Sequence, residues 1–375
     1  MNNLKKLAQK IQRRIFAPPT NIEKAILNLL FSIFSKVKPK NDGLKLKENL
    51  LIWDIRNNSI TFDLLHLLFE TSIRFCLKKE EKFDVLIYFP KNFIPELPLI
   101  KGYEKTIQKE DLMNRYKNLI IPIFKLNNSV RAIFYAENDI EALKIINSYK
   151  RKIPKVFNIN FYSPQPQDMV FVYKNLLRKS YQKEKIEDFS EIKPKIDTSH
   201  ELFGTRYVTL TLRDYGYSPL RNTSKSDIEK FITFANNKNA KPVIIPDNIS
   251  LIDKYNINQD ICFISYEARK NIYERVFLYS ESLVNIFTPS GPGALSLYTK
   301  SSKTIFFNFG CGGSDGSLKY YKKEGLFKHQ QPYLALGGYI LWKNEKAEYS
   351  VKDLHYAFDY LNKYIVKAKK LNFFK

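Results

Sequence analysis

Cysteine, histidine and long apolar runs are scarce in this chain, and each scarcity narrows what the protein can be. Its 375 residues include three cysteines and four histidines. Cys76, Cys262 and Cys311 are scattered without the CxxC spacing of zinc sites, and the histidines form no HExxH or similar cluster. We therefore expect a protein of a reducing cytosol, with neither a disulfide framework nor a bound metal.

The apolar run near the N-terminus, Ala25 to Phe34, is too short to cross a bilayer, which takes about 20 apolar residues. It lies late in its segment and lacks a small-residue cleavage site, unlike a secretory signal. We expect neither a membrane-spanning helix nor a cleaved leader.

Acidic residues are also few: lysine and arginine outnumber them 61 to 38, giving a net charge of +23. Residues 1–40 hold nine basic residues against one acid, and residues 362–375 hold five lysines and no acid, so the ends carry much of that excess. A strongly basic chain favours a polyanionic partner. Because aromatic and basic residues are not interleaved in any nucleic-acid motif, we do not expect that partner to be nucleic acid.

In the first segment apolar residues recur at helical spacing, as at Leu4, Leu7, Ile11 and Ile15. This pattern predicts a basic amphipathic helix, followed by a linker, over residues 1–48. Such a helix can lie in the interface of an anionic membrane, which would make the protein cytoplasmic and peripheral at the inner face of the membrane. The alternative is a helix that packs on the protein with a solvated basic face.

The rest of the chain alternates short buried strands with amphipathic helices. This predicts an α/β fold with two Rossmann-like domains facing a cleft. The first domain is expected over residues 49–165. Its predicted strands are 49–55, 83–89, 119–124, 130–135 and 155–161, and its predicted helices are 64–77 and 139–148.

A helix is expected over residues 169–181, and residues 182–200 are charged with little apolar periodicity, so residues 166–206 are expected to form the interdomain connection. The second α/β domain is expected over residues 207–349, followed by a closing helix and basic tail over 350–375. Its predicted strands are 207–212, 242–245, 261–264, 283–288 and 304–309, and its predicted helices are 225–236, 270–280 and 294–300.

The first strand of the second domain, YVTLTL, ends in a polar loop that contains Arg213, Asp214, Arg221 and Asn222. Ligands of open α/β sheets bind outside the carboxyl ends of the strands. An arginine at that place offers a rigid fork of donors that matches phosphate oxygens, so this loop is predicted to bind an anion, with Asp214 able to hold the fork. A loop that makes only interdomain salt bridges is the alternative.

A second candidate site is the turn Ser290-Gly291-Pro292-Gly293, between a predicted strand and a predicted helix. Glycines there let backbone N–H groups approach a diphosphate at the positive end of the helix dipole. Glycine-proline turns are also common without ligands. Asp247, after the strand ending VIIP, could reach a base or a ribose hydroxyl, or it could simply cap a helix.

Carboxylates also surround the end of the first strand of the first domain. Asp54 ends that strand, and Asp63 precedes the next helix. Either could act as a general base toward an acceptor hydroxyl, which requires a base within hydrogen-bond reach of that proton. Asp63 could equally be a helix cap.

These residues together resemble GT-B glycosyltransferases. The resemblance rests on an LRD element after the first strand of the C-terminal domain, a strand ending in proline-aspartate, and an SGP turn before a late helix. The pattern is similar to the fucosyltransferase-like group. It also resembles bacterial surface-polysaccharide glycosyltransferases with a phenylalanine-aspartate-led first helix, here Phe62-Asp63. The match covers roughly residues 49 to 345 in order.

The resemblance implies that Arg213 binds the donor diphosphate and that Ser290 to Gly293 cradles the donor phosphates. It also implies a metal-independent reaction with no cofactor beyond the nucleotide diphosphate sugar that serves as donor substrate. Thr211 stands where fucosyltransferases usually carry a histidine, which argues against GDP-fucose.

The predicted function is therefore that of a hexosyl- or fucosyltransferase-like enzyme. It would transfer a sugar from a nucleotide sugar to a glycan or lipid-linked acceptor in surface polysaccharide biosynthesis, with Arg213 and Arg221 neutralising the departing diphosphate. Two alternatives stay open. One is a non-catalytic polyanion- or membrane-binding protein, and the other is a sugar-nucleotide epimerase or hydrolase on the same fold.

Overall fold

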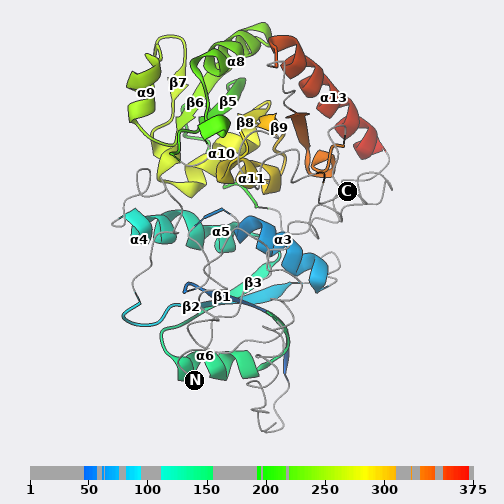
Figure 1. Cartoon of the computed structure of the whole chain (residues 1–375). Helices are drawn as coiled ribbons and strands as arrows, with labels where there is room; N and C mark the ends of the chain where they lie inside the picture. The colour runs from blue at the N-terminus through cyan, green and yellow to red at the C-terminus, as the bar shows by residue number, and fades with distance from the viewer. Residues whose placement is uncertain are drawn as a thin grey trace.

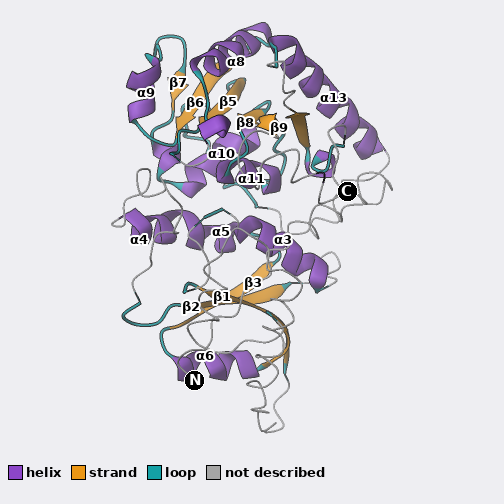
Figure 2. Ribbon diagram, viewed as in Figure 1, coloured by secondary structure: helices purple, strands orange, loops and turns teal. Residues whose placement is uncertain are grey.

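The computed structural model describes residues 46–56, 61–62, 64–75, 82–93, 111–154, 192–195, 197–216, 219–309, 322, 330–342 and 349–370. These residues form two α/β domains, each built on a sheet whose described strand pairs are all parallel (Figure 1, Figure 2). The prediction of an α/β fold with two such domains is confirmed. The predicted N-terminal helix lies outside the described residues.

The first domain has a four-stranded sheet in the order β3-β2-β1-β4. Its strands are β1 (Lys47–Asp54), β2 (Phe83–Tyr88), β3 (Val130–Ala136) and β4 (Tyr149–Ile153). Its helices are α3 (Leu64–Arg74), α4 (Asp111–Arg115), α5 (Ile121–Leu126) and α6 (Asp139–Asn147), with a π-helical turn at Tyr116–Ile120. Side chains of β1 alternate between two cores: Leu51 and Trp53 join the α3 and α5 side, and Leu50 and Ile52 the α6 side.

Two expectations for this domain need correction. The predicted strand 119–124 is wrong, because the chain is helical through Tyr116–Ile120 and Ile121–Leu126. The last strand of the sheet is Tyr149–Ile153, which the sequence did not predict, and the expected strand 155–161 lies outside the described residues.

The second domain has a six-stranded sheet in the order β10-β9-β8-β5-β6-β7. Its strands are β5 (Tyr207–Leu212), β6 (Lys241–Pro246), β7 (Phe263–Ile264), β8 (Asn285–Phe287), β9 (Thr304–Phe309) and β10 (Gly338–Trp342). Its helices are α8 (Lys225–Asn237), α9 (Ser250–Tyr255), α10 (Ile272–Glu281), α11 (Gly291–Tyr298) and α13 (Val351–Lys370). The sequence predicted five of these strands, and it missed β10 and α9.

Strand β5 is buried along its whole length, and its alternation explains its threonines. Val208, Leu210 and Leu212 face the core beneath α8 and α13. Thr209 and Thr211 point to the opposite face, where the Thr209 hydroxyl donates to Asn285 Oδ1 at 2.6 Å and the Thr211 hydroxyl lies 2.9 Å from the Tyr279 hydroxyl. Their buried hydroxyls are therefore paired, as a buried polar group requires.

The two domains meet through helices. One continuous apolar core runs from α3 and α5 of the first domain to α10 and α11 of the second, which Figure 1 shows as facing layers. His66 Nδ1 lies 3.1 Å from the Tyr298 hydroxyl, and the rings of Phe69 and Tyr298 are 5.4 Å apart. Ile192 forms bridges to Asn127 and Thr299, one in each domain. The domain boundaries themselves stay predictions.

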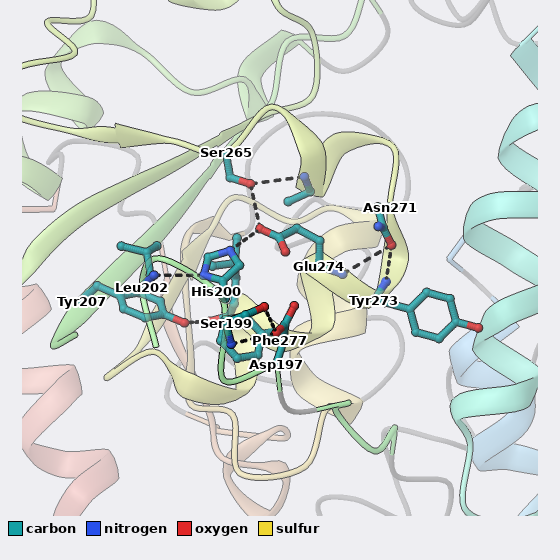
Figure 3. A network of polar contacts seen from close by, with 12 residues as sticks. Asp197, Ser199, His200, Leu202, Tyr207, Ser265, Asn271, Tyr273, Glu274 and Phe277 are labelled. Carbon is teal, nitrogen blue, oxygen red and sulfur yellow. Dashed lines mark hydrogen bonds and ion pairs between the residues drawn. The ribbon is translucent and has the colours of Figure 1, made fainter. Parts of the chain in front are cut away.

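The segment that leads into β5 is tied to α10 by a polar network (Figure 3). His200 Nδ1 accepts from the Leu202 backbone N–H at 3.0 Å, which leaves the proton on Nε2 to be donated to Glu274 Oε1 at 2.8 Å. Ser265 Oγ donates to the same carboxylate oxygen at 3.4 Å. Because α10 also carries Arg275, this network helps to hold that arginine in place.

No helix among the described residues is long and apolar enough to cross a membrane.

Candidate functional site

Three neighbouring strands of the second sheet, β8, β5 and β6, end at the same edge. Thr288 follows β8, Arg213 follows β5 and Asp247 follows β6. The strand order thus brings together residues that are more than 70 positions apart in sequence, at the edge where open α/β sheets bind ligands.

Arg213 is held from several sides and is only 2% exposed. Its backbone N–H donates to Thr223 Oγ1 at 3.0 Å, and its carbonyl accepts from the Thr223 N–H at 2.9 Å. Its guanidinium donates to Asn222 Oδ1 and stacks over the Tyr215 ring, 4.8 Å from the ring centre. The loop therefore orients the guanidinium before any ligand arrives.

Asn222 organises the rest of this loop. Its Oδ1 also accepts from the Tyr215 N–H at 3.0 Å, and its Nδ2 donates to Asp214 Oδ1 at 3.0 Å. Asp214, which was predicted to hold the Arg213 fork, pairs through its other oxygen with Lys254 at 2.7 Å. Asn222 is thus a positioning residue for Arg213. Arg221 lies half-buried in the same loop, in the short turn Pro219–Arg221.

Asp247 interacts electrostatically with three arginines. Arg275 Nη1 is 4.0 Å from Asp247 Oδ1, and Arg275 Nε donates to the Ala268 carbonyl at 2.6 Å. Burial raises the pKa of Asp247, and the charges of Arg275, Arg115 and Arg213, together with a hydrogen bond from Tyr215, oppose that rise. Three guanidinium groups around one carboxylate leave an excess of positive charge, which favours an anion.

The turn at Ser290 has the features of an anion site at a helix start. Ser290 is the N-cap of α11 in extended conformation, and its side chain makes no cap hydrogen bond. The first N–H groups of a helix lack intrahelical partners, so those of this turn point to what lies before α11. Gly291 also lies against the other domain, because a Cβ on it would be 3.0 Å from Phe62 Cδ2.

Gly293 also has a packing role, which is independent of phosphate binding. A Cβ at this position would lie 2.4 Å from Phe306 Cε1. Its small size therefore lets α11 approach the sheet closely.

In the first domain, Asp54 is fully buried at the end of β1, and its carboxylate forms a salt bridge with Arg56. Arg56 Nε donates to Asp54 Oδ1 at 2.9 Å and Nη2 donates to Oδ2 at 2.7 Å, while the guanidinium stacks on Tyr88, 4.6 Å from the ring centre. Asp63 lies outside the described residues. Its neighbour Phe62 lies against Gly291, so the structure brings this residue, just before α3, to the Ser290 turn.

Sequence reasoning missed Arg275, Arg115 and Thr288. Arg275 stands in the helix segment IYERVFLYSE, seven of whose ten residues are buried, and a charged residue beside a run of apolar ones is a signal that could have marked it. Arg115 belongs to a stretch for which no element was predicted. Thr288 was treated only as the last residue of a strand.

No group of three or more histidine, cysteine, aspartate or glutamate side chains that could hold a metal ion occurs within the described parts of the chain. The arrangement at the strand ends is instead suited to an anionic ligand bound by arginines and backbone N–H groups.

No protein-family model matches the chain, and no curated protein matches it. Several solved structures are similar in overall arrangement. A glycosyl transferase of family 9 from Veillonella parvula is 9% identical, with a TM-score of 0.48, over 84% of this chain and 97% of that one. The ADP-heptose LPS heptosyltransferase II of E. coli is 8% identical, with a TM-score of 0.39, over 86% of this chain and 100% of that one.

Proposed function

We propose that the chain is a glycosyltransferase. It transfers a sugar from a nucleotide diphosphate sugar, bound by the second domain, to a glycan or lipid-linked acceptor on the first domain, in surface polysaccharide biosynthesis. The observation that carries this proposal is the buried Arg213, oriented by its loop at the carboxyl edge of a parallel sheet, together with Arg275 and Arg115, which like Arg213 act electrostatically on Asp247 at that edge.

The arginines have a defined task in such a reaction. When the bond between the sugar and the diphosphate breaks, its electrons pass to a phosphate oxygen, and negative charge grows there. Arg213, already oriented by Asn222 and Tyr215, is placed to neutralise that charge without reorganising. Arg221 and the N–H groups at Ser290 and Gly291 are proposed to bind the remaining phosphate oxygens.

The second half of the reaction needs a base that takes the proton of the acceptor hydroxyl. The predicted candidates are Asp54 and Asp63. The contact of Phe62 with Gly291 supports a base close to Phe62 in sequence, because Phe62 itself lies next to the proposed phosphate site. We assign the base to Asp63 and give Asp54 the role of holding Arg56.

The proposal is tested by assaying transfer with Arg213→Ala and Arg213→Lys. Arg206→Ala is the matched control, since Arg206 is an exposed arginine just before β5. Removing a group that stabilises the transition-state charge should lower kcat by about 100-fold or more, with Arg213→Lys intermediate and Arg206→Ala near wild type. Circular dichroism checks that each variant is folded.

A folded Arg213→Ala protein with wild-type transfer would contradict the assignment of the diphosphate to this site. Release of free sugar without transfer to any acceptor would identify a hydrolase. Binding of polyanions without any response to nucleotide sugars would identify a binding protein. The assay uses donors that carry hexoses, fucose and heptose, so that it also identifies the sugar that the enzyme transfers.

A further inference from the structure

Arg115 brings a charge from the first domain to the ligand edge of the second. It is the last residue of α4, immediately before the π-helical turn Tyr116–Ile120. The helices α4 and α5 lie in the layer of the first domain that faces α10 and the ends of β6 and β7 (Figure 1). Arg115 Nε is buried and has no hydrogen-bond partner among the described residues.

Two atoms of the second domain, at the carboxyl edge of its sheet, are also buried polar atoms without a partner among the described residues. Asp247 Oδ2 and Thr288 Oγ1 are buried, and neither has a hydrogen-bond partner within the described chain. Their side chains are well shielded, since that of Asp247 is 9% exposed and Thr288 is 1% exposed. A buried polar group left unpaired is unfavourable, so three such atoms, two of them at this sheet edge and one on Arg115 that acts electrostatically on Asp247, point to a ligand that satisfies them.

The charges determine what kind of ligand this is. Arg115, Arg213 and Arg275 all act electrostatically on Asp247, and one carboxylate does not balance three guanidinium groups. Guanidinium N–H groups and a threonine hydroxyl are donors that suit phosphate oxygens. Asp247 then serves as the internal counter-ion that keeps the arginines together when no anion is bound.

We propose that Arg115 is a further anion-binding residue, which reaches across the domain boundary to contact the diphosphate held by Arg213. The inference rests on the proposed function, because the anion is the diphosphate of the donor. It adds that the donor site is completed by the first domain. Binding of the anion consequently strengthens the contact between α4 and the second domain.

The first experiment is titration calorimetry of the full chain with inorganic pyrophosphate. Arg115→Gln should weaken binding by about tenfold, and Arg115→Lys should weaken it less, because lysine keeps the charge but not the fork. Lys117→Gln removes the same charge from an exposed position two residues away and should change the affinity by no more than about twofold.

A second readout is hydrogen exchange of residues 111–126 with and without pyrophosphate. The wild-type protein should gain protection in this segment on adding pyrophosphate, and Arg115→Gln should not. The thermal midpoint of each variant in buffer shows whether it is folded. If Arg115→Gln does not fold, the comparison is made with Arg115→Lys instead.

Equal weakening by Arg115→Gln and Lys117→Gln would overturn the inference, because only net charge would then matter. Wild-type affinity in Arg115→Gln, or unchanged exchange in residues 111–126 of the wild type, would also overturn it while leaving the Arg213 site intact. Failure of the wild-type protein to bind pyrophosphate would overturn both this inference and the proposed diphosphate site.

Discussion

Arg213 shows how this fold handles a buried charge. A guanidinium that is almost completely buried must recover the cost of leaving water through hydrogen bonds and nearby charge. Asn222 and the Tyr215 ring supply neutral partners, and Asp247 supplies the opposite charge. Because Asn222 and Tyr215 carry no charge, the guanidinium keeps most of its positive field for an incoming anion. That arrangement suits binding better than a closed salt bridge would.

The two carboxylates proposed for the first domain can be separated by substitution. Asp63→Asn should lower kcat by about 100-fold or more while donor affinity stays unchanged, because a base acts on the acceptor proton only. Asp54→Asn should mainly lower the free energy of unfolding, by about 1–3 kcal/mol, because it weakens the partner of the partly buried Arg56. Steady-state kinetics, donor titration and urea unfolding measure the three quantities.

A loss of donor affinity in Asp63→Asn, without a loss of kcat, would contradict its role as the base. A stable Asp54→Asn protein with strongly reduced kcat would move that role to Asp54.

At the scale of elements, sequence periodicity predicted the helices and strands whose own apolar pattern is regular. Strands such as β5 and β9 are rich in β-branched and large apolar residues and are bounded by turns, and α8 has an amphipathic pattern with a capping box at Ser224. The strand prediction for residues 119–124 was wrong because a short apolar run looks the same in a buried helix and in a buried strand.

Strand β4 was missed because its sequence has too few apolar residues to be recognised as a strand. Its sequence, YKRKI, is mostly charged, because it is the edge strand of its sheet and exposes Lys150 and Arg151. Edge strands often carry charges that discourage pairing with another chain, and the same charges hide them from apolar patterning. Arg115 and Arg275 were missed likewise, since their meaning depends on which distant elements pack against them.

Gly293 provides a test of how α11 is seated. Gly293→Ala should destabilise the protein by about 1–3 kcal/mol, because the added Cβ would overlap the Phe306 ring. The double variant Gly293→Ala/Phe306→Leu should recover part of this loss by removing the ring. Thermal or urea unfolding measures both; if the double variant is no more stable than Gly293→Ala, close packing against Phe306 is not the reason for the glycine.

At the scale of the whole molecule, helices from both domains share one core between the two sheets. The proposed donor site at the end of β5 therefore lies where the first domain can contribute side chains: Arg115 acts electrostatically on Asp247, and Phe62 lies against Gly291. Length and alternation predicted two domains, but the contact between them depends on long-range packing that no local pattern encodes.

The basic ends of the chain support the proposal that the enzyme binds an anionic membrane surface, where a lipid-linked acceptor would lie. Deleting residues 1–40 removes a net eight positive charges and the predicted amphipathic helix. Fractionation of a detergent-free lysate should find the full chain with membranes and the deletion variant in the supernatant. High salt should release part of the full chain, because salt screens exposed charges. Equal partitioning of the two chains would contradict the proposal.

The most direct test of the central claim is the thermal midpoint of the wild-type chain with a panel of ADP, UDP, GDP and CMP sugars, including ADP-heptose. A ligand that binds only the native state at about 100 times its Kd adds ~2.7 kcal/mol of stability, enough to raise the midpoint by several degrees. We predict such a rise for one nucleotide class, and a much smaller rise with the same ligand in Arg213→Ala. If no nucleotide sugar raises the wild-type midpoint, or if Arg213→Ala responds equally, the chain does not bind a nucleotide diphosphate sugar at Arg213.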